Sequence, residues 1–205
     1  PLRRQRQMCI RDRLQTDDDL YNRFGGRLPG GTEDAYVTDG KWWQMRDELH
    51  TEITDSIIGD VPIAEPGEQV VHFMGGGPAS GKGNLISEGL ADVDRSTMVV
   101  VDADEIKDFL PEYQVLRDER ATRAAAYVHE ESSELSKRVF AESVESGRNT
   151  VLDGTGDSSI EKLRAKVSAA REASDDAKVI ADYVTVDLEE AVTRARRRGQ
   201  RTGRF

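Results

Sequence analysis

The sequence predicts an α/β fold with a parallel β-sheet flanked by helices. Short apolar runs begin at Val70, Met98, Thr150 and Val179, and segments with helical spacing separate them. This alternation of strand and helix is typical of parallel sheets with right-handed crossovers. The run Met98–Val101 has four apolar residues followed by acids, which indicates a strand buried on both faces.

A glycine-rich loop follows the first of these strands. Residues 70–83 read VVHFMGGGPASGKG and match the phosphate-binding pattern G-x-x-x-x-G-K-[ST] except at Gly83, where a hydroxyl residue is usual. Such loops wrap backbone N–H groups around phosphates, and the lysine reaches the outer phosphates. We therefore predict a three-layer P-loop NTPase fold that binds ATP or GTP, the alternative being a turn without a ligand. The predicted nucleotide contacts are Gly76, Gly77, Pro78, Ala79, Ser80, Gly81, Lys82, Gly83 and Asn84.

Composition restricts the class of protein. A chain of 205 residues with 37% hydrophobic residues can form one domain with a real core. The net charge of −10 argues against general attraction to nucleic acid. Because no apolar run reaches membrane-spanning length and no signal-peptide core is visible, we expect a cytoplasmic protein. The single cysteine, Cys9, excludes a disulfide framework.

We divide the chain into three regions. The segment Met8–Arg13 resembles a translated sequencing adapter, and residues 1–13 are interpreted as an artefact, with a basic disordered arm as the alternative. Removing their five Arg and one Asp changes the net charge from −10 to −14. Residues 14–69 form a lead-in, loop-like to residue 40 and then an amphipathic helix at 41–58. Residues 70–205 carry the loop, and we expect this domain to be incomplete at its C-terminus.

Further helices are expected between and after the strands. The pattern predicts them at residues 84–90, 105–110, 118–146, 160–173 and 188–198. Pro111 is read as the end of the short helix at 105–110, and Gly147 as the end of the long one.

Carboxylates follow two of the predicted strands, at the sheet edge where α/β folds bind ligands. Asp102 and Asp104 leave the second strand, and we predict that Asp104 is the base that accepts a proton from a substrate hydroxyl. One of the two could instead cap the following helix. Asp153 leaves the third strand and is predicted to hold a metal or the acceptor, with the Thr155 hydroxyl nearby.

Phosphoryl transfer also needs a divalent metal and positive charge on the transferring group. Because Gly83 supplies no hydroxyl, Mg²⁺ would rest on waters, on Ser80 or on strand-end carboxylates, with Asp153 or Asp102 as candidates. Arg194 and Arg204, in an arginine-rich terminal segment, are predicted to contact the γ-phosphate. The other arginines are read as a solvated helix face.

Taken together, five segments over residues 41–205 resemble the zeta-toxin family of P-loop kinases. They are VHFMGGGPASGKG, VVVDADEIKDFLPEY, VHEESSELSKRVF, GRNTVLDGTG and RARRRGQRTGRF. The resemblance implies an ATP-dependent kinase that phosphorylates the 3′-hydroxyl of UDP-N-acetylglucosamine and is inhibited by an antitoxin protein. It also implies that Lys82 binds phosphates, that Asp104 is the base, and that Arg194 and Arg204 bind the γ-phosphate.

For the sugar nucleotide, the resemblance implies contacts from Asp153 and Thr155, with Glu131 as a second acid. This chain departs from the family pattern at Gly83, where Ser or Thr is usual, and at Asp153, where the family has Glu. Two alternatives stay open. One is a kinase for a nucleotide or a polynucleotide 5′-hydroxyl, and the other is a non-catalytic nucleotide-binding module of a larger phage or conjugation protein.

Overall fold

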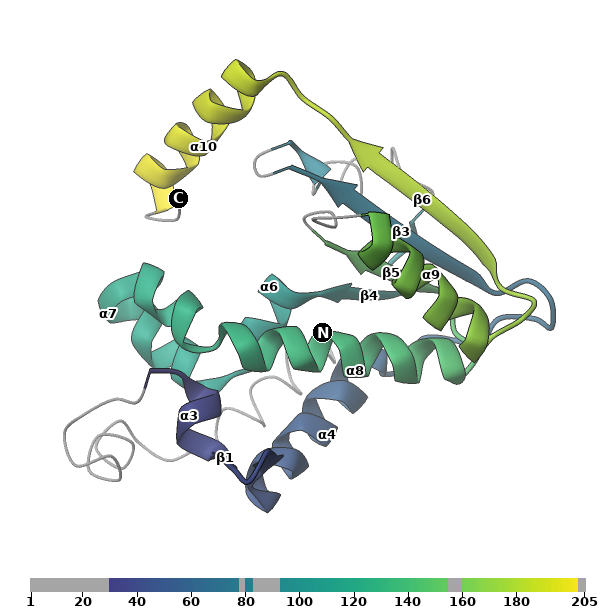
Figure 1. Cartoon of the computed structure of the whole chain (residues 1–205), viewed down its shortest axis with the longest axis horizontal. Coiled ribbons are helices and arrows are strands. Elements are labelled where there is room, and N and C mark those ends of the chain that lie inside the picture. Colours follow the sequence, from purple (N-terminus) through teal and green to yellow (C-terminus); the bar gives the residue numbers. More distant parts are fainter. Residues whose placement is uncertain (1–29, 78–79, 83–92, 155–159, 203–205) are drawn as a thin grey trace. The chain divides into compact units, whose positions relative to one another are not determined.

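A computed structural model of the chain describes residues 30–77, 80–82, 93–154 and 160–202 (Figure 1). The chain forms two compact units, which are described separately. One contains the residues up to Ile57 together with Ala103–Lys137, and the other contains Ile58–Asp102 and Arg138–Phe205. Residues 1–13, interpreted as an artefact, lie outside the described residues, as does the predicted helix at 84–90. No helix in the described ranges is both long and apolar enough to cross a membrane.

The second unit is built on a four-stranded sheet in the order β4-β5-β3-β6. Its strands are β3 (Val70–Gly76), β4 (Val99–Asp102), β5 (Thr150–Asp153) and β6 (Lys178–Val184). Every pairing is parallel, with β3 hydrogen-bonded to β5 on one side and to β6 on the other. The α/β fold class predicted from the sequence is confirmed.

The two faces of this sheet follow the alternation of side chains along the strands. On one face Met74, Val100 and Val151 pack with Met98 in a buried cluster. On the other face Phe73 contacts Phe140 of α8 (His129–Glu145), with ring centroids 5.7 Å apart. Because both faces are apolar, the strands appear in the sequence as continuous hydrophobic runs.

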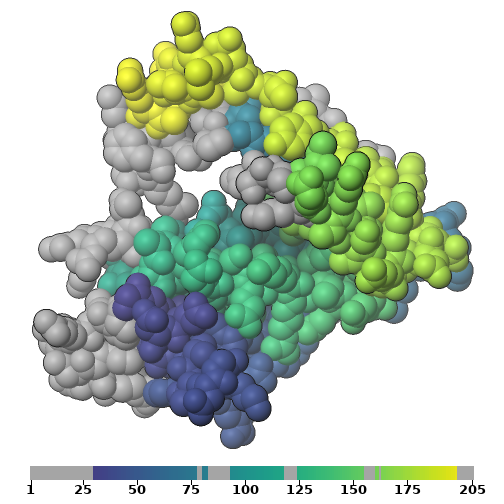
Figure 2. All heavy atoms as spheres, viewed as in Figure 1, coloured from purple at the N-terminus to yellow at the C-terminus, as the bar shows by residue number. Residues whose placement is uncertain are grey.

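Helix α9 (Ile160–Ala173) lies over the same face as Phe73, and Figure 2 shows it in green against β6. Between them is a cavity of about 240 Å³, lined largely by Phe73, Leu152, Leu163 and Tyr183. The predicted helix at 188–198 is present as α10 (Leu188–Thr202).

The first unit contains the N-terminal elements. A short helix, α3 (Thr32–Tyr36), leads into a hairpin of β1 (Val37–Thr38) and β2 (Lys41–Trp42), and α4 (Gln44–Ile58) follows. Residues 14–40 were predicted to be loop and residues 41–58 to be helix, so α3 and the hairpin were not foreseen. The second strand occupies Lys41–Trp42, and the helix begins only at Gln44. Asp39 and Gly40 at the hairpin turn have φ values of 52° and 70°. An Asp-Gly pair is a strong hairpin signal, and here the strands were too short for their alternation to show.

The helices of residues 103–145 also differ from the prediction. Helix α6 covers Ala103–Lys107, and α7 covers Pro111–Tyr127. Pro111 therefore begins α7, whereas the sequence indicated only the end of the preceding helix. Proline is favourable in the first helical turn because the N–H that it lacks has no intrahelical partner there. The predicted helix 118–146 is interrupted at Val128, which has φ −106° and ψ 11°.

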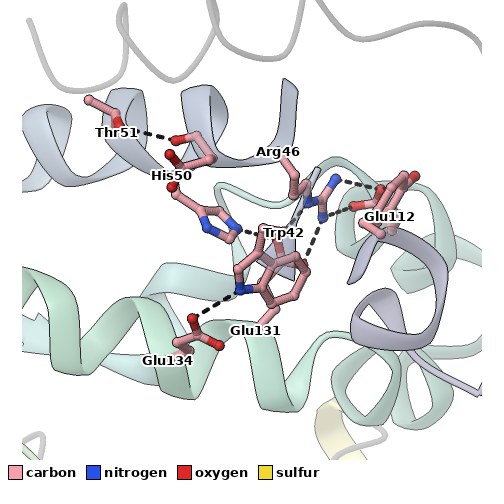
Figure 3. Close-up of polar contacts among 9 residues, drawn as sticks. Trp42, Arg46, His50, Thr51, Glu112, Glu131 and Glu134 are labelled. Carbon is pink, nitrogen blue, oxygen red and sulfur yellow. Dashed lines mark hydrogen bonds and ion pairs between the residues drawn. The ribbon is translucent and has the colours of Figure 1, made fainter. Parts of the chain in front are cut away.

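A buried polar network joins the helices of the first unit (Figure 3). The Arg46 guanidinium donates to both oxygens of Glu112 at 2.8 Å and to the two oxygens of Glu131 at 2.5 and 2.8 Å. His50 Nε2 lies 2.6 Å from Glu131 Oε1, and Tyr36 donates its hydroxyl to Glu112 at 2.8 Å. The side chains of Arg46, Glu112 and Glu131 are at most 5% exposed. One arginine thus connects α4 to both α7 and α8.

Arg46→Ala is expected to destabilise the protein by about 3–5 kcal/mol, because it leaves two buried carboxylates without their cation. Arg117→Ala is the matched control, since the Arg117–Asp108 pair is about two-fifths exposed on each side. That change should cost less than about 1 kcal/mol. Urea unfolding of both variants measures the difference. Equal losses would show that the Arg46 network does not stabilise the fold.

Candidate phosphate-binding and catalytic site

The glycine-rich loop follows β3. After β3 the chain forms β4 and β5 on one side of this strand and later forms β6 on its other side. In open α/β sheets this reversal of strand order marks the ligand crevice. The Ser80 N–H donates to the Gly77 carbonyl at 3.1 Å, which closes a turn of the loop. Gly81 has φ 98°, a backbone conformation that favours glycine.

Close packing inside the loop requires glycine at position 76. A Cβ atom there would lie 2.7 Å from Ser80 Oγ and 2.9 Å from the Val184 carbonyl oxygen, so only a hydrogen can be accommodated. Glycine at this point lets the backbone turn closely, as a loop that presents N–H groups to phosphate oxygens requires.

The lysine of the loop meets a carboxylate from the neighbouring strand. Lys82 Nζ lies 2.6 Å from Asp153 Oδ1, and the two side chains are only 16% and 9% exposed. Asp153 ends β5 and is the register partner of Met74 on β3. The following Gly154 N–H donates to the Met74 carbonyl at 3.0 Å. Pairing of β5 with β3 therefore positions this ion pair.

A second cation reaches the loop from α10. Arg194 Nη1 donates to the Ser80 carbonyl at 3.3 Å, while Arg194 Nε donates to Glu190 at 2.7 Å on the same helix. Three elements thus bring Lys82, Asp153 and Arg194 to one loop.

The strand-end carboxylates also include Asp102 and Asp104. Asp102 ends β4 and is the register partner of Asp153. Asp104 lies two residues later on α6, where its carboxylate accepts from Lys107 Nζ at 2.7 Å and is 74% exposed. In the described ranges no three His, Cys, Asp or Glu side chains form a metal-holding group. Asp102 and Asp153 end adjacent strands as register partners, and carboxylates are groups that bind Mg²⁺ together with phosphates and waters.

Several predicted site residues lie outside the described part of the chain. These are Pro78, Ala79, Gly83, Asn84, Thr155 and Arg204. Their predicted roles stay predictions.

Glu131 lies in the polar network of the first unit and not in an open position. Its side chain is 0% exposed, and both carboxylate oxygens already accept hydrogen bonds from Arg46. The predicted contact with the acceptor does not fit this arrangement. Burial raises the pKa of Glu131, but hydrogen bonds from His50 and Arg46 and the charge of Arg46 outweigh it and lower the pKa to about 2.

Sequence reasoning considered His50 as a possible site residue but favoured a packing role for it, and it missed Arg46 and Glu112, which also surround Glu131. Arg46 and His50 lie on a helix whose apolar spacing drew attention, and Glu112 directly follows Pro111. Arg46 and Glu131 are 85 residues apart in the sequence, and Arg46 and Glu112 are 66 apart. At such separations no local sequence pattern indicates that these side chains meet.

A parallel sheet, a glycine-rich loop after its central strand, and a lysine paired with a strand-end carboxylate define an α/β protein of the P-loop kinase-like class. The family model described as "Zeta toxin" matches residues 54–205, and the chain belongs to this family. No curated protein matches the sequence.

Solved structures agree on the fold. The chain resembles a structure from the PezAT chromosomal toxin-antitoxin system of Streptococcus pneumoniae, with TM-score 0.62 and 14% identity over 80% of this chain and 64% of that one. It also resembles the AvrRxo1-ORF1:AvrRxo1-ORF2 structure with sulphate ions, with TM-score 0.58 and 18% identity over 82% of this chain and 59% of that one. A related structure with ATP gives TM-score 0.57 and 16% identity, with 82% and 59% coverage. The chain spans less than two thirds of each.

The lowered pKa of Glu131 predicts a specific loss of stability in acid. A carboxylate with a pKa of 4.5 when unfolded and about 2 when folded contributes stability above pH 4.5, and this is lost as pH falls toward 2. The full contribution is about 3 kcal/mol. Glu131→Gln should therefore flatten the dependence of unfolding free energy on pH in this range.

Glu130→Gln is the control for this pH series, because Glu130 is the adjacent residue on α8 and is exposed. Urea unfolding at successive pH values between 6 and 2 compares the two variants with the unchanged protein. If Glu130→Gln flattens the curve as much as Glu131→Gln, the buried network is not the source of the acid sensitivity.

Proposed function

We propose that the chain is an ATP-dependent phosphotransferase of the zeta-toxin type that transfers the γ-phosphate to a hydroxyl of a small molecule. The observation that carries this proposal is the convergence of Lys82, Asp153 and Arg194 at the loop after β3. Two cations beside a phosphate cradle provide the charge stabilisation that phosphoryl transfer needs.

Each group has a proposed part in the reaction. Lys82 and Arg194 hold the phosphate chain, and Asp153 orients the Lys82 ammonium at 2.6 Å. Asp104 takes the proton of the acceptor hydroxyl, whose oxygen forms the new bond to the γ-phosphorus while the bond to the β-phosphate oxygen breaks and ADP leaves. Mg²⁺, held by Asp102 or Asp153, would neutralise charge on the phosphates.

We propose UDP-N-acetylglucosamine as the acceptor, phosphorylated at its 3′-hydroxyl, on the basis of family membership. Asp153 departs from the family's Glu and shortens the acid by one methylene, which changes its reach toward an acceptor. An antitoxin protein is the proposed partner, since one of the similar structures comes from a toxin-antitoxin system.

Lys82→Ala is expected to weaken ATP binding at least tenfold, because it removes the loop's charged contact with phosphate and leaves Asp153 without its cation. Lys178→Ala is the control, since Lys178 is an exposed residue at the start of β6 in the same unit. Calorimetric titration with ATP measures both affinities. Unchanged binding in Lys82→Ala would remove the phosphate loop from the proposal.

Asp104→Asn is expected to lower kcat about 10²–10⁴-fold while leaving ATP affinity nearly unchanged, as loss of a general base does. Asp108→Asn, which changes an exposed carboxylate four residues later, is the control. The assay contains ATP, Mg²⁺ and a panel of sugar nucleotides that includes UDP-N-acetylglucosamine, and phosphorylated products are identified by mass spectrometry.

The same assay separates the alternatives. Transfer to DNA 5′ ends or nucleotides, with none to sugar nucleotides, would replace the acceptor class. If the unchanged protein binds ATP but transfers phosphate to no acceptor, or if Asp104→Asn leaves every measured activity unchanged, the chain is a non-catalytic nucleotide-binding module.

A further inference from the structure

One buried lysine has its charged end beside the proposed base. Lys107, the last residue of α6, is buried, and its Nζ donates a hydrogen bond to Asp104 Oδ1 at 2.7 Å. Lysine is among the residues least often buried, and it is buried mainly where its charge is paired. The proposed reaction gives Lys107 no part, so its burial calls for an explanation.

The two members of this ion pair differ greatly in exposure. The Lys107 side chain is 10% exposed, whereas the Asp104 side chain is 74% exposed. Water can satisfy an exposed carboxylate in several rotamers, so such a side chain loses conformational entropy when it is held in one of them. Lys107 supplies a buried, fixed point to which the exposed Asp104 carboxylate is held.

The chain around Lys107 is anchored in the interior of the first unit. The Lys107 carbonyl accepts a hydrogen bond from the Leu110 N–H at 3.0 Å, and Ile106 and Leu110 are both buried. Residues three apart in a helix are neighbours on one face, which brings the Lys107 ammonium to the Asp104 carboxylate. The position of the ammonium is therefore set by packing and not by solvent.

A general base depends strongly on its orientation. Its oxygen must come within hydrogen-bond reach of the proton that it removes, and a misplacement of about 1 Å can lower a rate about 10²-fold. The contact with Lys107 uses Oδ1, and the two oxygens of an ionised carboxylate can together accept about four hydrogen bonds. Asp104 can thus be held by Lys107 and accept from a substrate hydroxyl at the same time.

We propose that Lys107 is a positioning residue, which holds the Asp104 carboxylate in the orientation from which it accepts the proton of the acceptor hydroxyl. Lys107 acts through Asp104 and does not contact the substrate. This inference rests on the proposed function, in which Asp104 is the base. The competing explanation is that the pair only stabilises the short helix α6, as ion pairs three residues apart do.

The test measures kcat, ATP affinity and melting temperature in Lys107→Met, which keeps an unbranched stem but removes the ammonium. We expect kcat to fall roughly tenfold and ATP affinity to change less than about twofold, because only the orientation of the base is lost. The melting temperature should stay nearly unchanged, since methionine suits a buried position and Asp104 remains hydrated. Lys107→Arg, which keeps the charge, should retain most of kcat.

A double-mutant cycle identifies the residue through which Lys107 acts. In the Asp104→Asn background, Lys107→Met should lower kcat no further, because the base that it positions is already absent. Lys137→Met is the matched control, since Lys137 is an exposed residue on α8 in the same unit, and it should leave kcat unchanged. Lys107→Gln, which keeps a neutral donor, should give an intermediate kcat and preserves the test if Lys107→Met does not fold.

The outcomes separate this inference from the proposed function. An unchanged kcat in Lys107→Met and Lys107→Gln overturns the positioning role and leaves the proposed function intact, whether or not the melting temperature falls. An equal loss of kcat from Lys107→Met with and without the Asp104 carboxylate also overturns it, because Lys107 would then not act through Asp104. If the unchanged protein transfers phosphate to no acceptor, or Asp104→Asn has full activity, the proposed function fails together with this inference.

Discussion

The position of β3 between β5 and β6 is the constraint on which the placement of the glycine-rich loop depends. Pairing on both sides holds this strand in a fixed register, so its end delivers the glycine-rich loop to one place. The β5 register sets Asp153 beside Met74, within reach of Lys82. A change in strand order would leave every residue of the loop present but would separate Lys82 from its carboxylate.

Buried charge occurs in both units, with different consequences. In the first unit, one arginine satisfies two carboxylates that are almost completely buried. Because the carboxylate oxygens of these acids already accept hydrogen bonds from the arginine, the network stabilises the packing of α4 on α7 and α8. It therefore has little remaining hydrogen-bonding capacity for a ligand. In the second unit, Lys82 and Asp153 form an ion pair. It lies beside Gly76, where the Ser80 hydroxyl and the Val184 carbonyl oxygen pack closely against the backbone. That pair retains hydrogen-bonding capacity for a phosphate.

The contrast between Glu131 and Asp153 shows how far sequence reasoning reaches. Both were predicted to contact the acceptor, and both are acids near segments that resemble the same family. Asp153 is the last residue of β5, and the rule that parallel strands end at one sheet edge places it near the loop. Glu131 lies in a helix, where the side that faces the interior depends on which helices pack nearby. Arg46 comes from an N-terminal helix whose apolar spacing gave no indication that it pairs with Glu131.

Helix boundaries illustrate the same limit. The interruption at Val128 separates α7 from α8, although the sequence reads as one helical run. Valine is tolerated in helices, so its identity alone does not indicate the break. Pro111 indicated that a helix boundary was near but not whether a helix begins or ends there. Proline is favourable both in the first turn of a helix and in the segment that follows a helix.

By itself the sequence determined the strands, their parallel class and the register of the phosphate loop. These features depend on local patterns: runs of apolar residues, glycines at fixed spacing, and carboxylates directly after strands. Only the tertiary structure decided which charges meet. Lys82 and Asp153 are 71 residues apart, and Arg46 and Glu131 are 85 apart. Such pairings depend on strand order and helix packing, which no local pattern in the sequence encodes.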